Sequence, residues 1–189
     1  RVEARYSEET LGRLVNSSDV RARRGAVFAL GLLGSSGSNA SLGKALADDD
    51  RIVRELASRS LWSVWFRAGT PEQNDELRVI AELNTRGLLS EARRQANRLI
   101  AQAPEFAEAY NQRAIALFGL GAFAESARDC QRVLELNPYH FGALGGLGQC
   151  YLKLGRLDLA LETFRRALAL QPHDEGLKQL VQVLESDRP

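Results

Sequence analysis

A period of 34 residues in the second half of the chain limits its fold more than any other feature. Glycines and prolines recur at this spacing, at Gly87, Gly121 and Gly155 and at Pro104, Pro138 and Pro172. Apolar positions such as Leu83, Leu117 and Tyr151 repeat in the same register. A glycine can end a helix in a left-handed conformation, and a proline prevents the helix before it from continuing. Each period therefore predicts two short helices. Because one such hairpin cannot bury its own apolar face, the units must stack into an all-α solenoid.

The repeating stretch divides into three units, at residues 73–106, 107–140 and 141–174. The pattern is most regular in the third unit and weakest in the first. It resembles the tetratricopeptide repeat family, and the resemblance covers residues 73–174. Arg113 and Glu76 depart from it, because the family usually has apolar or aromatic residues at these places. Residues 175–186 predict a C-terminal capping helix, with an apolar face made of Leu177, Leu180, Val181 and Leu184.

The N-terminal third of the chain carries a different repeat, with a period of 31 residues. The stretches ARRGAVFALGLLG, from Ala22, and VRELASRSLWSVW, from Val53, share an apolar helical face. An aspartate precedes each stretch by three residues, at Asp19 and Asp50, where it can cap the helix and favour the positive end of its dipole. Over residues 8–66 the pattern resembles the HEAT repeat, in the short form found in bilin lyases and bacterial scaffold proteins. The resemblance implies two further helical hairpins.

The boundary between the two kinds of repeat is expected near Gly69. Thr70, Pro71 and Gln73 read as an N-cap, a first-turn proline and a capping-box partner. We therefore assign two domains, HEAT-like repeats at residues 1–69 and three tetratricopeptide units with a cap at residues 70–189. The whole is predicted to be a right-handed α-solenoid of about eleven antiparallel helices. The short connection favours a rigid joint, with a hinge at Gly69 as the alternative.

Three features of the N-terminal part admit both a functional and a structural interpretation. Trp62 and Trp65 could form an exposed aromatic site, but a seam against the first tetratricopeptide unit is favoured. The polar stretch GSSGSN, from Gly34, lacks the lysine and the preceding strand of a phosphate-binding loop and is interpreted as a turn. Six arginines could bind phosphate, but ion pairing between stacked repeats is favoured. They are Arg21, Arg23, Arg24, Arg51, Arg54 and Arg59.

The sequence offers no motif of an enzyme. It contains no nucleophile elbow, zinc-binding His-Glu-x-x-His or phosphate-binding Walker sequence, so the chain is interpreted as non-catalytic, with no cofactor and no metal. His140 and His173 follow prolines in loops between repeats and are expected to be solvated. Cys130 and Cys150 lie on neighbouring helices and are expected to be small buried residues without a disulfide.

Composition argues against several classes of partner. The 189 residues carry a formal net charge of +1, too little to favour nucleic acid or an acidic membrane surface. No apolar run reaches the roughly 18 to 20 residues needed to span a bilayer, and no signal peptide opens the chain. Because the chain begins at Arg1 and contains no methionine, we expect an excised domain or a processed product, with a cytoplasmic location favoured.

The tetratricopeptide resemblance implies that the first helix of each unit lines a concave groove that binds a partner. Carried over residue by residue, it gives the groove residues Leu77, Arg78, Asn111, Gln112, Ile115, Phe118, Gly142, Gly145, Gly146, Gln149, Leu152 and Lys153. The three glycines are unusual, because glycine within a helix costs about 0.5 to 1 kcal/mol relative to alanine. They are interpreted as a bare floor for a partner, although a loop packed against them would also explain them. Chaperone cofactors of the family clamp a C-terminal carboxylate with polar and cationic residues, but the matching places here are Leu77, Ala81, Gln112, Gly142 and Gly146.

The favoured function is a non-catalytic adaptor that binds a partner peptide or protein segment in this groove. The expected partner is another protein or another part of the parent chain, and a mixed polar and apolar peptide is the favoured ligand. Two alternatives stay open. The array could be a structural module that self-associates without a peptide ligand, or an accessory lyase-like subunit that acts on a bound chromophore, as the HEAT resemblance suggests.

Overall fold

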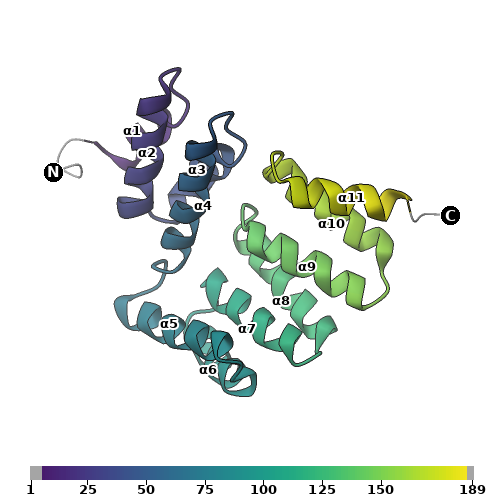
Figure 1. Ribbon diagram of the computed structural model, residues 1–189. Helices are drawn as coiled ribbons and strands as arrows, with labels where there is room; N and C mark the ends of the chain where they lie inside the picture. The colour runs from purple at the N-terminus through teal and green to yellow at the C-terminus, as the bar shows by residue number, and fades with distance from the viewer. Residues whose placement is uncertain (1–5, 187–189) are drawn as a thin grey trace. The chain divides into compact units, whose positions relative to one another are not determined.

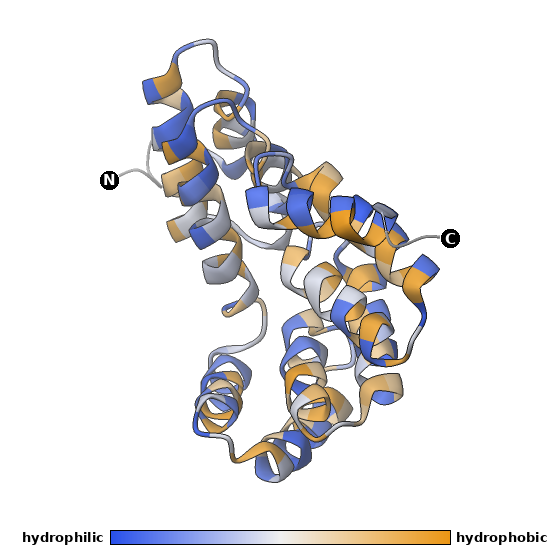
Figure 2. Ribbon diagram, turned by 45° about the vertical axis from the view of Figure 1, so that its right-hand side comes forward, coloured by the Kyte–Doolittle hydropathy of each residue, from blue (hydrophilic) through white to orange (hydrophobic). Residues whose placement is uncertain are grey.

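The computed structural model describes residues 6–186, which form eleven α-helices and one short 3-10 helix (Figure 1). No β-strand occurs within this range, so the all-α prediction is confirmed. The chain divides into two compact units, Arg1–Ala68 (unit 1) and Gly69–Pro189 (unit 2), and each is described by itself. Hydrophobic and hydrophilic residues alternate along the helices (Figure 2), as helices with one buried face require.

Unit 1 consists of two helical hairpins. Its elements are α1 (Glu8–Leu14), α2 (Val20–Leu33), the 3-10 helix η1 (Ser36–Ser38), α3 (Asn39–Ala45) and α4 (Arg51–Trp65). The predicted aspartate caps are confirmed. The Asp19 carboxylate accepts a hydrogen bond from the Arg21 amide at 2.8 Å, at the start of α2. Asp50 accepts one from the Val53 amide at 2.9 Å, at the start of α4. Two hairpins are what the HEAT resemblance implies, but the family assignment of this unit stays a prediction.

The second helices of the two hairpins, α2 and α4, lie in close contact. The Ser60 hydroxyl of α4 donates to the Val27 carbonyl of α2 at 3.0 Å. A Cβ added to Gly31 would lie only 2.2 Å from Ser60 Oγ, so glycine permits this approach. Buried apolar side chains from all four helices fill the core, among them Leu11, Val27, Leu30, Leu42, Val53 and Leu61. Helices α2 and α4 pack on each other far more extensively than α1 and α3 do.

Arg67 ties the end of unit 1 back to α2. Its guanidinium donates to the carbonyl oxygens of Gly31 at 2.6 Å and Gly34 at 2.9 Å. The last carbonyl groups of a helix have no partner within the helix, and a cation is favoured at that end. Arg67 therefore holds the segment after α4 against the C-terminal end of α2.

Unit 2 consists of three helical hairpins and one final helix. Its helices are α5 (Pro71–Thr85), α6 (Leu89–Gln102), α7 (Ala107–Gly119), α8 (Phe123–Leu136), α9 (Phe141–Lys153), α10 (Leu157–Leu170) and α11 (Glu175–Ser186). The helix-ending glycines Gly87, Gly121 and Gly155 have φ angles of 73°, 78° and 68°. A side chain with a Cβ is strained in this left-handed region, so the prediction that glycine ends the first helix of each unit is confirmed.

The start of unit 2 is fixed by two polar contacts. Thr70 Oγ1 accepts a hydrogen bond from the Gln73 amide, and Gln73 Oε1 accepts one from the Thr70 amide at 3.0 Å. This is the predicted capping box. The Asn74 side chain also bonds both the amide and the carbonyl group of Gly69, at 3.0 and 3.1 Å, which holds the residue that precedes the cap.

The first helices of the three hairpins form one face of unit 2. Helix α7 contacts both α5 and α9, whereas the second helices α6, α8 and α10 form no comparable contact with one another in residues 6–186. Closer spacing of the first helices makes their side the inner one, as the tetratricopeptide resemblance implies. The final helix α11 packs on α10 and buries Val181, which covers the apolar end of the array.

Candidate partner-binding groove

Three of the predicted groove side chains are buried within the chain. Leu77 is 0% exposed, Asn111 4% and Gln112 5%. Leu77 belongs to the apolar core, and the two amide side chains are held by hydrogen bonds to a neighbouring carboxylate. The expectation that these three line an accessible groove is therefore wrong as regards their side chains.

The carboxylate that holds them is Glu108, in the first turn of α7. Glu108 Oε1 accepts hydrogen bonds from Asn111 Nδ2 at 2.9 Å and from Gln112 Nε2 at 2.8 Å. Its other oxygen faces His140 Nε2 at 2.9 Å, and both the Glu108 and the His140 side chains are fully buried. Asn84 of α5 extends the network, because its Nδ2 donates to Gln112 Oε1 at 3.0 Å. A buried carboxylate requires such donors.

The geometry fixes the tautomer of His140. Its Nδ1 accepts a hydrogen bond from the Ala143 amide at 3.0 Å, which caps the N-terminus of α9. An acceptor nitrogen carries no proton, so the proton of the neutral ring is on Nε2 and is donated to Glu108. The prediction that His140 is a solvated loop residue is wrong: its ring is both a helix cap and a donor to a buried acid. His173 is exposed, as expected.

Part of the predicted groove is open to solvent. Ile115 of α7 is 44% exposed, and Gln149 and Lys153 of α9 are exposed as well. A Cβ added to Gly145 would meet no other atom within 4 Å. These four residues lie on the adjoining helices α7 and α9 and are called the inner strip below.

The remaining predicted groove residues lie in different surroundings. Arg78 is exposed and forms an ion pair with Asp75. Phe118 packs edge to face on Phe123, with 5.2 Å between ring centroids. A Cβ added to Gly146 would lie 3.3 Å from Cys130 Sγ, so the close approach of α8 accounts for this glycine. Gly142 and Leu152 are partly buried, and Leu152 packs on the α10–α11 core.

Arg113 departs from the apolar pattern because it has a buried partner. Its guanidinium binds the Asp129 carboxylate in a bidentate geometry, with both N–O distances at 2.7 Å. It also donates to Asn97 Oδ1 at 2.7 Å. The hydrogen bond to Asp129 raises the pKa of Arg113. These side chains line a cleft of about 260 Å³.

The equivalent cleft one repeat later is larger and less polar. It measures about 440 Å³ and has Leu147 and Thr163 in the places of Arg113 and Asp129. Leu147 follows Arg113 by 34 residues, and Thr163 follows Asp129 by the same number. The two clefts therefore occupy the same position in successive repeats and are filled by different pairs of side chains. The apolar filling follows the family pattern, and the ionic one is a paired substitution.

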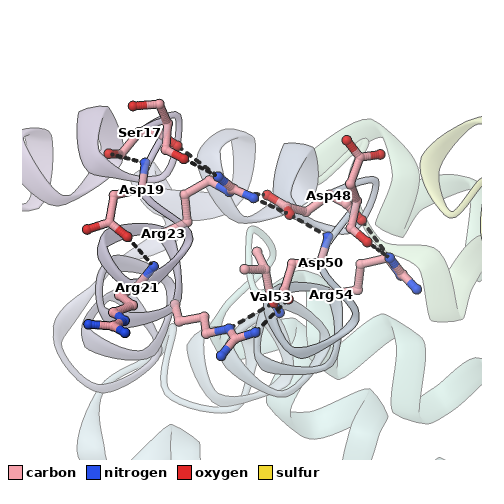
Figure 3. A network of polar contacts seen from close by, with 11 residues as sticks. Ser17, Asp19, Arg21, Arg23, Asp48, Asp50, Val53 and Arg54 are labelled. Atoms are coloured by element: carbon pink, nitrogen blue, oxygen red, sulfur yellow. Dashed lines mark hydrogen bonds and ion pairs between the residues drawn. The ribbon is translucent and has the colours of Figure 1, made fainter.

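Two arginines of unit 1, Arg23 and Arg24, form ion pairs between its two repeats (Figure 3). Arg23 of α2 binds the Asp48 carboxylate of the next hairpin through Nε at 2.7 Å and Nη2 at 3.0 Å. Its third nitrogen donates to the Ser17 carbonyl at 2.9 Å. Arg54 repeats this last contact one period later, because its Nη1 donates to the carbonyls of Asp48 and Asp49 at 2.7 and 2.8 Å.

Two further arginines are paired and two are not. Arg24 binds Asp50 at 2.6 Å, and Arg51 binds Glu55 at 2.7 Å. The predicted ion pairing between stacked repeats is thus confirmed for Arg23 and Arg24, whereas Arg51 pairs within α4 and Arg54 bonds backbone carbonyl groups. Arg21 and Arg59 are exposed, and neither forms an ion pair with any of residues 6–186.

The other sequence features are accounted for by internal contacts. The Ser35 amide and the Ser38 hydroxyl of the GSSGSN turn donate to the Glu8 carboxylate at 3.1 and 2.5 Å, so these donors are already engaged. The Trp65 indole is 4% exposed and donates to Asn39 Oδ1 at 3.0 Å, which excludes an exposed site at this ring. The seam with unit 2 stays a prediction.

The two thiols are free and buried. Cys150 Sγ donates to the Ser126 hydroxyl at 3.2 Å, and Cys130 is 2% exposed. The neighbouring Cys150 and burial raise the pKa of the Cys130 thiol. Within the described residues, no group of three or more metal-binding side chains converges. None of the described helices is both long enough and apolar enough to span a membrane.

Comparison with known proteins gives two matches to models of the tetratricopeptide repeat, at residues 83–141 and 117–184. Together they run from residue 83 to residue 184. A TPR repeat-containing protein of Rhizobium etli is 35% identical over 85 residues, which covers 45% of this chain and 42% of the relative. Hsp70-Hsp90 organizing protein 1 of Glycine max is 31% identical over 135 residues, which covers 71% of this chain and 22% of the relative. The chain spans less than half the length of these curated relatives.

Solved structures share the fold. The first TPR domain of Spaghetti, bound to an HSP90 peptide, superposes with a TM-score of 0.59 at 20% identity and covers 62% of this chain and 94% of its own. The TPR2B domain of yeast Sti1, in complex with an Hsp70 peptide, has a TM-score of 0.56 at 25% identity and covers 62% of this chain and 99% of its own. Both matches cover about the length of unit 2.

Proposed function

Because this chain belongs to the tetratricopeptide repeat family, we propose that unit 2 is a non-catalytic adaptor whose inner strip binds a segment of a partner protein. The segment lies across α7 and α9, where Ile115, Gly145, Gln149 and Lys153 are accessible. Leu152 and Phe118 border the strip. The charges of the inner strip limit the class of partner segment that it can bind.

The observation that carries the proposal is the open space at Gly145. A glycine in the middle of a helix costs about 0.5 to 1 kcal/mol relative to alanine, and here no neighbour requires it, since a Cβ would meet nothing within 4 Å. Gly148, three residues later, is different, because Phe164 occupies the place of its side chain. A glycine without a structural reason beside the exposed Ile115 favours a surface kept bare for a ligand.

The ligand class follows from the charges of the inner strip. The related domains of Spaghetti and Sti1 bind HSP90 and Hsp70 peptides. At the five places that match the carboxylate clamp, this chain has Leu77, Ala81, Gln112, Gly142 and Gly146, none of which is a cation. Leu77 and Gln112 are also buried. A partner segment with mixed apolar and polar side chains, bound by Ile115, Gln149 and Lys153, fits this surface better than a chain-terminal carboxylate does.

A pull-down from lysate of the source cells tests this function. The bait is the full chain, compared with a Gly145→Arg/Gln149→Glu variant that adds bulk and charge to the inner strip without touching the core. The control carries Leu159→Arg and Arg166→Glu, two exposed positions on the second helix α10. A protein retained by the intact chain and the control but lost from the inner-strip variant supports the proposal.

Equal retention by all three baits would contradict it. Circular dichroism of each variant shows whether the helices are intact. Sedimentation equilibrium distinguishes the self-associating module: a mass that rises with concentration and is unchanged by Gly145→Arg would favour that alternative.

A further inference from the structure

The solvent-exposed face of α2 carries two large apolar side chains. Arg21, Gly25, Phe28 and Leu32 follow one another at helical spacing, and therefore form one stripe along the helix. Phe28 is 53% exposed and Leu32 is 60% exposed. Between Arg21 and Phe28 the stripe is hollow, because a Cβ on Gly25 would meet nothing within 4 Å.

The neighbouring helix α4 widens this stripe into a surface. Its repeat-equivalent residues, 31 positions later, are Ile52, Leu56, Arg59 and Ser63. Ile52 is 45% exposed and Leu56 is partly buried. The contact between Ser60 and Val27 fixes α2 against α4 at 3.0 Å, so these two rows of side chains hold a constant spacing. We call the eight residues the α2–α4 face.

The charge of the α2–α4 face is positive. Arg21 and Arg59 are its ionised members, and neither is in an ion pair with a residue of the described range, whereas Arg23, Arg24 and Arg51 are engaged by acids. The acid on α4, Glu55, interacts electrostatically with Arg59, but its carboxylate accepts its hydrogen bond from the Arg51 guanidinium, at 2.7 Å. The cations of this face are therefore available to an external carboxylate.

We propose that the α2–α4 face is a second docking surface, which binds an acidic amphipathic segment of a partner protein. Apolar side chains of the segment pack on Phe28, Leu32 and Ile52, and one of them enters the hollow at Gly25. Its carboxylates meet Arg21 and Arg59. The surface shares no residue with the inner strip, so this inference does not depend on the proposed function.

The test uses the full chain and a defined probe. The probe is a fluorescent, amidated peptide of 18 residues with leucines on one helical face and glutamates on the rest, and its binding is followed by fluorescence anisotropy. A Phe28→Ser/Leu32→Ser variant should bind it at least tenfold more weakly, about the loss expected for one buried apolar side chain. Arg21→Glu/Arg59→Glu should weaken binding similarly and reduce its dependence on salt.

A Gly25→Leu variant distinguishes a loss of probe binding from a loss of folding. Leucine favours a helix more than glycine does, and no atom lies where its Cβ would be, so the variant should melt at the same temperature or higher while it binds the probe less. Val183→Ser, which removes an equally exposed side chain from α11, should leave the affinity unchanged. The Gly145→Arg/Gln149→Glu variant should also bind the probe normally, which separates this surface from the inner strip.

Three results would overturn the inference. The first is absence of binding to the intact chain, or equal binding by the intact chain and the Phe28→Ser/Leu32→Ser variant. The second is equal affinity for a peptide with lysines in place of the glutamates. The third is self-association that Phe28→Ser/Leu32→Ser abolishes, which would make a second copy of the chain the occupant.

Discussion

His140 Nε2 lies 2.9 Å from the Glu108 carboxylate, and both side chains are fully buried. Since Nδ1 of the same ring accepts from the Ala143 amide, the ring can only donate to Glu108. The network thus joins the first turn of α7 to the start of α9. It also explains why the Asn111 and Gln112 side chains are buried on the inner face of unit 2, since both donate to the same acid.

We predict that Glu108→Gln lowers the free energy of unfolding by about 1 to 3 kcal/mol. Glutamine offers one oxygen, so either His140 or the Asn111 and Gln112 pair must face its NH₂ group, donor against donor. Glu108→Ala leaves all three donors unpaired and should cost more, at least about 3 kcal/mol, because each unsatisfied buried donor costs about 1 to 3 kcal/mol. Urea titration followed by circular dichroism measures both. A Glu108→Gln variant as stable as the native chain would contradict the assigned tautomer.

A second prediction uses the two fillings of the repeat-equivalent cleft. Arg113→Leu leaves Asp129, which is 6% exposed, as a buried charge without its partner, and should cost about 3 to 5 kcal/mol. Arg113→Leu combined with Asp129→Thr copies the Leu147 and Thr163 pair and should recover most of this loss. The measurement is a double-mutant cycle of unfolding free energies. Additive effects of the two changes would show that the ion pair is not what makes Arg113 compatible with the fold.

Two glycines of α9 should respond to alanine with opposite signs. Gly145→Ala adds a Cβ to open space and should stabilise the chain by about 0.5 to 1 kcal/mol through helix propensity. Gly148→Ala places a Cβ 2.5 Å from the Phe164 ring, and displacement of this buried ring should cost about 1 to 3 kcal/mol. Chemical denaturation of both variants gives the comparison. A stabilising Gly148→Ala would mean that α9 and α10 separate more easily than their contact indicates.

A pH dependence is predicted for the ion pair between the repeats of unit 1. The hydrogen bond from Arg24 holds the pKa of the Asp50 carboxyl at about 2, below its ordinary value of 3.8. A carboxyl pKa that is lower in the folded state stabilises the fold above the unfolded value, and this contribution is lost as the pH falls through about 2. Asp50→Asn keeps an N-cap side chain for α4 but removes the charge.

We therefore expect Asp50→Asn to lower the melting temperature at pH 7. The difference from the native chain should shrink as the pH is lowered from about 4 to about 2. Asp49→Asn, at the exposed neighbouring position, is the control for removal of a charge in general. A difference that stays constant over this pH range would show that Asp50 acts through its cap alone.

The helical framework could be predicted from the sequence because backbone requirements repeat with it. Gly87, Gly121 and Gly155 stand where a left-handed residue is needed, and the capping box at Thr70 marks a helix start by residue type. The accessible side chains could not be predicted in the same way. Position within a repeat indicates which side of a helix a residue occupies. Whether Asn111 is exposed depends instead on its hydrogen bond to the Glu108 side chain.

The two buried polar pairs of unit 2, which the sequence did not predict, do leave a signal in it. Arg113 breaks the apolar pattern, and Asp129 lies at the place that Thr163 holds one repeat later. When two positions that contact each other in the repeat both carry polar residues in place of the usual ones, the two residues are expected to interact. The same logic applies to Glu108 and His140, an acid in the first turn of one helix and a histidine at the cap of the next first helix. Burial of the pair still depends on tertiary packing.

The empty space at Gly145 has a consequence for how this repeat can diverge. A Cβ can be added there without moving a neighbour, because no atom lies within 4 Å of its place. Gly148, one turn away, has no such freedom, since Phe164 occupies the adjacent space. Single substitutions at residue 145 can therefore change the exposed surface of α9, while the packing of the same helix on α10 is inherited unchanged.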